Sequence, residues 1–262
     1  MQELPKTMEP SRRATLLACS AALLACAAPR GFAAPESGYL APAVALHIEA
    51  WLPPAPADDS LAKAADLEVY FRTRSLIGTA RAEEAHADDV PPRPAAGVAP
   101  RFAYVLGVTL DERSAPHLLA MMERVRGDAE LLLAPVKKSV GNGGRHRPFV
   151  EYPQLPKCPV GYAGLADSGS YPSGHATLGW LWGSILAETA PDYADALLAR
   201  AMAFGDSRVV CGFHYPSDVA AGRLAAAALL ARLHADAGFQ RDLAAARREV
   251  GALLAARRAA AH

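Results

Sequence analysis

Residues 207–218 read Ser-Arg-Val-Val-Cys-Gly-Phe-His-Tyr-Pro-Ser-Asp. A helix that begins near Tyr215 would place His214 and Asp218 one turn apart on the same side. The carboxylate of Asp218 could then accept the Nδ1 proton of His214 and leave Nε2 free as a base, a nucleophile or a metal ligand. The alternative is a plain helix cap, formed by Ser217 and Asp218 after a surface histidine. The rest of the chain has to decide between the two interpretations.

The composition favours a helical globular protein. The chain has 262 residues, of which 52% are hydrophobic, enough to bury a sizeable core. Alanine and leucine are abundant, whereas β-branched and aromatic residues are sparse, and this favours helices over sheets. Lys and Arg together number 27, as do Asp and Glu, so no overall basic charge points to a nucleic-acid partner.

The first residues have the pattern of an export signal, which we assign to 1–34. Arg12 and Arg13 precede an apolar run at 14–28, and small residues follow, as in a cleaved secretory signal peptide. The run is too short to span a membrane, and the paired arginines also permit a twin-arginine signal. We expect a periplasmic or secreted protein without a membrane span in the mature chain. Lipoprotein anchoring at Cys26 is the alternative to ordinary cleavage.

Two of the four cysteines remain after removal of such a signal. Cys158 and Cys211 form an even pair, and an exported protein usually meets an oxidising environment. We predict that they form a disulfide, which would stabilise the fold by about 4 kcal/mol through the entropy of the unfolded chain. Two buried free thiols are the alternative. The bond would hold the stretch at 207–218 against the loop that contains Cys158.

The remaining pattern predicts an all-α protein with one domain over 35–262. An extended N-terminal segment and a first helix are expected within 35–100, and the helical core that carries the chemistry within 101–262. Apolar spacing and capping residues predict helices over about residues 58–86, 102–109, 114–134, 173–190, 192–204, 217–234 and 240–257. The proline-rich stretch 88–100 is predicted to contain no helix, and 145–171 to form an irregular loop near a site.

Three groups of polar residues stand out in this framework. They are Lys138 with Arg147-Pro148, then Pro172-Ser173-Gly174-His175, and then the stretch from Arg208 to Asp218. A phosphate ester reacts through a state whose charge spreads over three oxygens, so cations and positioned donors do most of the catalytic work. Arg147 and Arg208 can bind such oxygens in bidentate fashion, and Lys138 can add a point charge. The hydroxyl of Ser173 and the amide of Gly174, at a helix N-terminus, also favour an anion.

These groups resemble the signature of the bacterial class A non-specific acid phosphatases, within the superfamily of type 2 phosphatidic acid phosphatases and vanadium haloperoxidases. That signature reads Lys-x6-Arg-Pro, then Pro-Ser-Gly-His, then Ser-Arg-x5-His-x3-Asp. Its second and third parts match without a gap, and the likeness extends from about Tyr39 to the last helices. The resemblance implies a helical bundle of the type 2 phosphatidic acid phosphatase kind and an acid phosphatase that needs no cofactor.

The first part of the signature departs from the family pattern. Eight residues separate Lys138 from Arg147, where the family has six, and position 140, at strict spacing, is Val. We take Lys138 as the equivalent lysine, with a two-residue insertion in the turn at 141–144. Lys137 is the rival assignment.

The resemblance also implies how the residues divide the work. His214 would attack phosphorus to form a phosphohistidine, and Asp218 would orient it. His175 would protonate the leaving oxygen and then activate water. Because His214 must start neutral and His175 protonated, the pH–rate profile should be bell-shaped and lean to acid. The other histidines show no paired ligand spacing, so no metal site is expected.

The expected partner is a small phosphomonoester, hydrolysed with broad specificity. A vanadium-dependent haloperoxidase is an alternative, because the same cradle holds vanadate. A non-catalytic periplasmic phosphate-binding module is another, although binding alone needs no paired histidine and aspartate. A membrane lipid phosphatase is disfavoured by the missing spans. An exposed apolar helix face would favour a homodimer.

Overall fold

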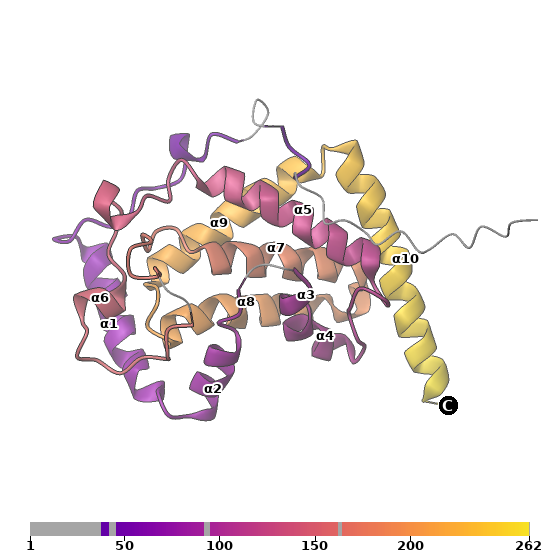
Figure 1. Cartoon of the computed structure of the whole chain (residues 1–262), viewed down its shortest axis with the longest axis horizontal. Coiled ribbons are helices and arrows are strands. Elements are labelled where there is room, and N and C mark those ends of the chain that lie inside the picture. Colours follow the sequence, from indigo (N-terminus) through magenta and orange to yellow (C-terminus); the bar gives the residue numbers. More distant parts are fainter. Residues whose placement is uncertain (1–37, 42–45, 92–94, 162–163, 262) are drawn as a thin grey trace, which may run out of the picture. The chain divides into compact units, whose positions relative to one another are not determined.

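The fold was obtained as a computed structural model, which describes residues 38–41, 46–91, 95–161 and 164–261. The signal peptide predicted at 1–34 and Cys26 lie outside this part of the chain. The described residues contain α helices and short 3-10 turns but no strand (Figure 1), which confirms the all-α prediction. None of the described helices is both long and apolar enough to cross a membrane.

Ten α helices follow one another along the described chain. They are α1 (Leu61–Thr73), α2 (Ala80–Ala87), α3 (Ala95–Val98), α4 (Pro100–Leu106), α5 (Pro116–Leu133), α6 (Pro148–Glu151), α7 (Gly174–Thr189), α8 (Ala194–Val210), α9 (Pro216–Leu233) and α10 (Ala237–Ala260). Five of the seven predicted helices end within about one turn of their predicted bounds, as expected for assignments made from sequence periodicity.

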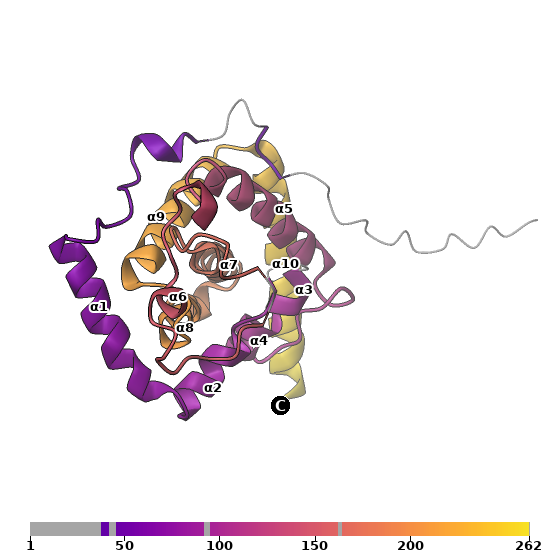
Figure 2. The ribbon, with the colours of Figure 1, turned by 60° about the vertical axis from the view of Figure 1, so that its left-hand side comes forward.

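The helix α7 forms the centre of the core. It packs against α5, α8, α9 and α10, which surround it when it is viewed nearly end-on (Figure 2). Twelve of its sixteen residues are buried, so it is apolar on nearly all sides, as a helix enclosed by others must be. Trp182 is buried at its middle and donates its indole N–H to the carbonyl of Met122 in α5 at 3.1 Å. Because α7 begins at the predicted Pro-Ser-Gly-His motif, the packing around this helix also fixes the position of the motif.

Two glycines allow α8 to approach α7 closely. A side chain at Gly179 would meet the ring of Phe204, and one at Gly183 would meet the Cβ atom of Ala201. Both neighbours belong to α8, whose backbone could not come this near to a bulkier surface. The close contact fixes where the last turn of α8, which carries Arg208, lies relative to the first turn of α7.

The long first helix predicted over 58–86 is broken in the structure. The helix α1 ends at Thr73, a 3-10 turn follows at Arg74–Leu76, and Gly78 adopts a left-handed φ of 90° before α2 begins. Arg74 holds this break, because its guanidinium donates to the carbonyl oxygens of Val209 at 2.5 Å and Val210 at 2.9 Å. These partners lie far away in the sequence, so the helical periodicity of 58–86 could not reveal the break.

Two further predicted bounds are wrong. The stretch 88–100 was predicted to contain no helix, yet α3 lies within it and Pro100 occupies the first turn of α4. Proline is tolerated there because the first amides of a helix have no partner in the helix. The helix predicted to end at 204 runs on to Val210 and stops before Gly212, whose φ is 81°. Arg208 therefore lies on a helix and not in a loop.

The predicted disulfide between Cys158 and Cys211 is present. The amide of Cys158 also donates to the carbonyl of Cys211 at 3.1 Å, and both residues pack in a small apolar cluster with Phe213. Cys211 is the C-cap of α8. The bond therefore ties the irregular loop before α7 to the chain segment that connects α8 with α9.

Candidate active site

Distant segments of the chain meet at the first turn of α7. Ser173 caps this helix by accepting the amide of Ala176 at 3.3 Å, and its own amide donates to the carbonyl of Asp218 at 3.0 Å. A cavity of about 720 Å³ opens here. Its wall is formed by Pro91, Ala129, Glu130, Leu133, Ala134, Lys137, Ser139, Arg147, Asp167, Ser168, Gly169, Gly174, His175, Leu178 and His214. Both predicted catalytic histidines thus face one cavity.

His214 is held at both ring nitrogens. Arg147 donates through Nη1 to His214 Nε2 at 2.8 Å, while His214 Nδ1 lies 3.3 Å from Ser170 Oγ and 3.4 Å from Asp218 Oδ2. A guanidinium only donates, so Nε2 is the acceptor nitrogen and the ring proton is on Nδ1. This is the tautomer that a nucleophilic Nε2 requires.

The surroundings of His214 favour its neutral form. Burial lowers its pKa well below the ordinary value of 6.5, and the nearby charges of Arg147, Lys137 and Arg208 lower it further. Asp218, the carboxylate in contact with the ring, favours the protonated form of His214 and so acts in the opposite direction. The side chain therefore starts as a neutral base, and Asp218 is the carboxylate placed to stabilise its protonated form.

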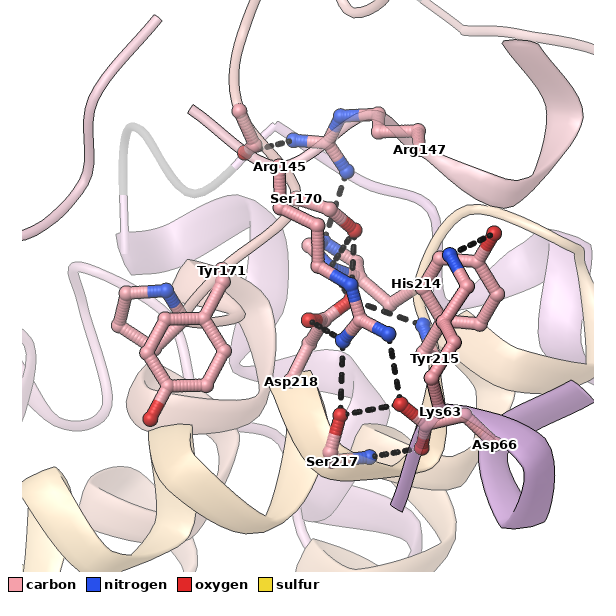
Figure 3. A network of polar contacts seen from close by, with 12 residues as sticks. Lys63, Asp66, Arg145, Arg147, Ser170, Tyr171, His214, Tyr215, Ser217 and Asp218 are labelled. Carbon is pink, nitrogen blue, oxygen red and sulfur yellow. Dashed lines mark hydrogen bonds and ion pairs between the residues drawn. The ribbon is translucent and has the colours of Figure 1, made fainter. Parts of the chain in front are cut away.

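Asp218 is fully buried and serves two purposes. Its Oδ2 accepts the hydroxyl of Ser170 at 2.5 Å and the amide of Tyr215 at 2.8 Å, and Oδ1 accepts Nη1 of Arg145 at 2.8 Å (Figure 3). The bond to Tyr215 caps the start of α9. The plain-cap interpretation is wrong in two respects, because the N-cap of α9 is Tyr215 and His214 is buried, but Asp218 does accept the N-cap amide while it faces His214.

His175 lies on the first turn of α7. Its Nε2 is 3.0 Å from the carbonyl of Val90, which can only accept, so Nε2 carries a proton. The ring stacks on Phe204 at a centroid distance of 6.4 Å. Burial and the charge of Arg208 lower its pKa well below 6.5, although the bond to Val90 acts in the opposite direction. A protonated His175 therefore needs an additional negative charge close by.

The two motif arginines lie in different environments. Arg147 lines the cavity and donates to His214 and to the carbonyls of Ser168, Gly169 and Phe213. Arg208 is fully buried and is not part of the cavity wall. Its Nη1 donates to Asp89 at 2.5 Å, whereas Nε and Nη2 have no hydrogen-bond partner within the described chain.

The free Nε and Nη2 of Arg208 form one edge of the guanidinium. Two unpaired N–H groups side by side can donate together to one acceptor group. The parallel N–H groups of such an edge match two oxygens of a carboxylate or phosphate. Arg208 thus has the geometry of a prepared anion site, anchored from the other side by Asp89.

The structure favours Lys137, the rival assignment, over Lys138 as the lysine of the site. Lys138 is exposed and does not line the cavity, whereas Lys137 does. Lys137 Nζ donates to the carbonyls of Gly169 at 3.0 Å and Pro172 at 2.7 Å. Burial, together with the charge of Arg147, lowers the pKa of Lys137 to about 7. The turn after α5 decides which of the two neighbours points inward, and local spacing carries no such information.

Several residues of the site were not identified from the sequence. Ser170 contacts both His214 and Asp218, Arg145 contacts Asp218, and Asp89 holds Arg208. Only Arg145 gave a signal, since it stands two residues before Arg147, but a basic loop is also typical of a solvated surface. The described residues contain no cluster of three His, Cys, Asp or Glu side chains arranged to hold a metal ion.

Comparisons with known proteins agree with this arrangement. The PAP2 superfamily profile matches residues 129–241, which include α7, α8, α9 and the cavity-lining lysine. An acid phosphatase of Zymomonas mobilis subsp. mobilis is 39% identical over 202 residues, 76% of this chain and 74% of its own. Non-specific acid phosphatases of Providencia stuartii and Salmonella typhimurium are 35% and 34% identical, over 78% and 80% of this chain and 81% and 82% of theirs.

The family profile covers both histidine motifs, and the chain spans most of each relative. This chain therefore belongs to the PAP2 superfamily and, within it, to the bacterial non-specific acid phosphatases.

Proposed function

We propose that this chain is an exported enzyme that hydrolyses phosphate monoesters, with His214 as the nucleophile and without a metal ion. The observation that carries the proposal is the way in which His214 is held. Its Nδ1 lies against Asp218, and Nε2 points to Arg147 at the cavity. In this tautomer Nε2 carries the lone pair that a nucleophile needs, and Arg147, which donates to it in the free protein, would turn its N–H to a phosphate oxygen when the substrate binds.

The phosphate would be bound by three cations and the start of α7. Lys137 and Arg147 line the cavity, and Arg208, whose charge acts on the cavity-lining His175, would offer its unpaired edge to two oxygens. The amide of Gly174 lies in the first turn of α7, where backbone amides have no hydrogen-bond partner within the helix and can donate to an anion. Together these groups supply the charge stabilisation that metal ions provide in other phosphoryl-transfer sites.

In the first half-reaction the lone pair of His214 Nε2 forms a bond to phosphorus while the bond from phosphorus to the ester oxygen breaks. His175 gives a proton to the departing oxygen, so a neutral alcohol leaves. The proton on His214 Nδ1 stays in place, and Asp218 stabilises the positive charge that the ring acquires. The product is a phosphohistidine.

In the second half-reaction a water molecule attacks phosphorus. His175, now neutral, accepts a proton from that water, and the bond between phosphorus and Nε2 breaks with its electron pair returning to the ring. Inorganic phosphate leaves, and both histidines regain their starting protonation states. Atoms and charges balance over the two steps without any further reactant.

The substrate itself would supply the charge that protonated His175 needs. In the protein alone, burial and Arg208 lower the pKa of His175. A phosphate dianion bound to Arg208 offsets that positive charge and raises the pKa of the histidine again. Protonation of His175 and substrate binding would thus favour each other.

The part of the cavity that would receive the alcohol is largely apolar. Leu178 follows His175 by one turn of α7, and Ala129 and Leu133 face the cavity from α5. Apolar walls accept many groups of suitable size, because they rely on burial and shape and not on directed hydrogen bonds. This supports broad specificity. The Cys158–Cys211 disulfide in turn supports an oxidising, extracytoplasmic compartment.

The test is an assay of the purified protein with p-nitrophenyl phosphate in the presence of EDTA. We expect turnover, a burst of p-nitrophenol in rapid mixing, and an acid-labile phosphoryl label that is absent from His214→Ala. Loss of activity with EDTA would exclude the metal-free reaction, and an active His214→Ala protein would exclude the nucleophile.

Two other outcomes would replace the proposal. Phosphate binding without turnover of any monoester would identify a binding module. Peroxide-dependent halide oxidation after addition of vanadate, without phosphatase activity, would identify a haloperoxidase.

A further inference from the structure

Arg145 binds the oxygen of Asp218 that does not face His214. Its Nη1 donates to Asp218 Oδ1 at 2.8 Å and to Ser217 Oγ at 2.7 Å, and its Nη2 donates to Asp66 Oδ2 at 2.7 Å (Figure 3). Asp66 comes from α1, about 150 residues before Asp218. Arg145 therefore connects the carboxylate behind the histidine to a distant helix.

Asp66 closes this network against the start of α9. Its Oδ1 accepts the amide of Ser217 at 2.9 Å, and its Oδ2 accepts the hydroxyl of Ser217 at 2.5 Å. The guanidinium of Arg145 also lies over the ring of Tyr215, 4.1 Å from its centroid. With two carboxylates, a hydroxyl and an aromatic face around it, Arg145 is held in one orientation.

Arg145 is buried but remains a cation. The exposed fraction of its side chain is 7%, and those of Asp66 and Asp218 are 4% and 0%. Burial opposes its charge, but Asp218 and Asp66 outweigh that effect and raise its pKa. Both Nη atoms of Arg145 are occupied by Asp218, Ser217 and Asp66, and the side chain does not line the cavity, so Arg145 is not placed to bind a phosphate. Any influence on the reaction must pass through Asp218.

We propose that Arg145 is a positioning residue for the reaction, which acts on His214 through Asp218 and is itself held by Asp66. The proposal rests on the function proposed for His214. Arg145 fixes the Asp218 carboxylate so that Oδ2 stays near Nδ1 of His214. Its positive charge also offsets part of the negative charge of Asp218, and so limits how far Asp218 raises the basicity of His214.

The charge of Arg145 should change the pKa of His214 in one definite direction. The charged or titratable groups around His214 are Lys137 after α5, Arg147 before α6, His175 of α7, Arg208 of α8 and Asp218 of α9. Asp218 is the anion in contact with the ring. Without Arg145, its charge is less compensated and favours protonated His214 more strongly. The pKa of His214 should therefore rise when Arg145 is neutralised.

The test uses Arg145→Met, which keeps an unbranched apolar side chain and removes the guanidinium with its charge. We expect kcat for p-nitrophenyl phosphate to fall by about tenfold to a hundredfold, the range found when a partner that orients a functional histidine is removed. KM should stay within about twofold, because the Nη donors of Arg145 are occupied within the protein and none is left to bind the substrate's phosphate. The acid limb of the kcat/KM profile should move to higher pH by about half a unit or more.

A second measurement does not depend on turnover. Titration of His214, followed by NMR with ¹⁵N-labelled histidine, should show the same upward shift of its pKa in Arg145→Met. If the wild-type protein proves not to be a phosphatase, the function proposed above fails, while this titration still decides whether Arg145 acts on His214. The two ideas can thus fail separately.

Two control variants isolate the effect. Arg145→Lys keeps the charge but cannot bind Asp218 and Asp66 together, so kcat should fall while the acid limb stays at its wild-type position. Arg200→Gln removes another buried arginine, which pairs with Asp88 and lies outside the cavity wall. It should lower the melting temperature without moving the acid limb.

The proposal is overturned if Arg145→Met loses activity equally at every pH and leaves the titration of His214 unchanged, because that is the result of a purely structural role. If Arg145→Met does not fold, Arg145→Lys decides. A wild-type kcat in that variant would show that the simultaneous binding of Asp218 and Asp66 by Arg145 has no part in positioning His214.

Discussion

Nδ1 of His214 lies 3.4 Å from Oδ2 of Asp218, the same oxygen that accepts the amide of Tyr215 and so caps α9. The orientation of the histidine is therefore tied to the start of a helix of 18 residues that packs against α7. A loop histidine gains the rigidity of the core in this way. A site that must hold a reacting atom in place benefits from such a support.

Replacement of Asp218 by asparagine separates these two purposes. Asparagine keeps an acceptor for the amide of Tyr215 but carries no charge to stabilise the ring of His214 once phosphorus is attached. We expect kcat to fall by about a hundredfold to ten-thousandfold, as in other histidine–carboxylate pairs. The free energy of unfolding should also fall, by about 3 kcal/mol, because the buried cation of Arg145 loses one of its two carboxylate partners. Near wild-type kcat in Asp218→Asn would show that the carboxylate only caps the helix.

Lys137 and Lys138 form a matched pair of substitutions. Only Lys137 lines the cavity. We expect Lys137→Met to lower kcat/KM for p-nitrophenyl phosphate by about tenfold to a hundredfold, because a cation next to the phosphate is lost. For Lys138→Met we expect kcat/KM to stay within about twofold of the wild-type value, since the charge of Lys138 is exposed and screened by solvent. The opposite ranking would restore the assignment made from the sequence.

The pH–rate profile should be bell-shaped and lean to acid. His214 reacts when neutral, and burial with the neighbouring cations lowers its pKa, so the acid limb of kcat/KM should lie below 6.5. His175 reacts when protonated, and its pKa in the free protein is also lowered, so the basic limb should begin below 6.5 as well. A flat profile between about pH 4 and about pH 9 would contradict both assignments.

The same two histidines should make the fold less stable in acid. Their pKa values are lower in the folded chain than the 6.5 of an exposed histidine, so the unfolded chain binds more protons. Their contribution is fully present above 6.5 and is lost as the pH falls toward the folded values. Urea unfolding should therefore show a free energy that declines from about pH 7 to about pH 5. His175→Asn should make this decline shallower.

The disulfide should add measurably to stability. Cys158 and Cys211 are 53 residues apart, and closing a loop of this length in the unfolded chain is worth about 4 kcal/mol. Unfolding by urea should show about this loss after reduction, and a double substitution to serine should make the protein insensitive to reductant. If reduction leaves the unfolding midpoint unchanged, the bond does not constrain the unfolded chain as expected.

Much of the helical architecture could be predicted because it depends on local patterns. Ser173 and Gly174 mark the start of α7, and apolar residues at helical spacing mark α5, α9 and α10, so these bounds agree with expectation. The break between α1 and α2 has a local mark at Gly78, whose φ of 90° favours glycine, but the extension of α8 to Val210 depends on distant contacts such as that of Arg74 with Val209. Periodicity reports only on neighbours within a few turns.

The candidate site also contains residues that the sequence predicted and partners that only the structure revealed. Two short motifs contain His175, Arg208, His214 and Asp218. The reactions that these residue types can carry out could be inferred from the sequence alone. Which lysine faces the cavity, which carboxylate anchors Arg208, and which cation lies behind Asp218 were decided by the tertiary structure. The physical reason is distance along the chain. A motif fixes what its own side chains can do, whereas their partners arrive from helices that are brought close only when the core packs.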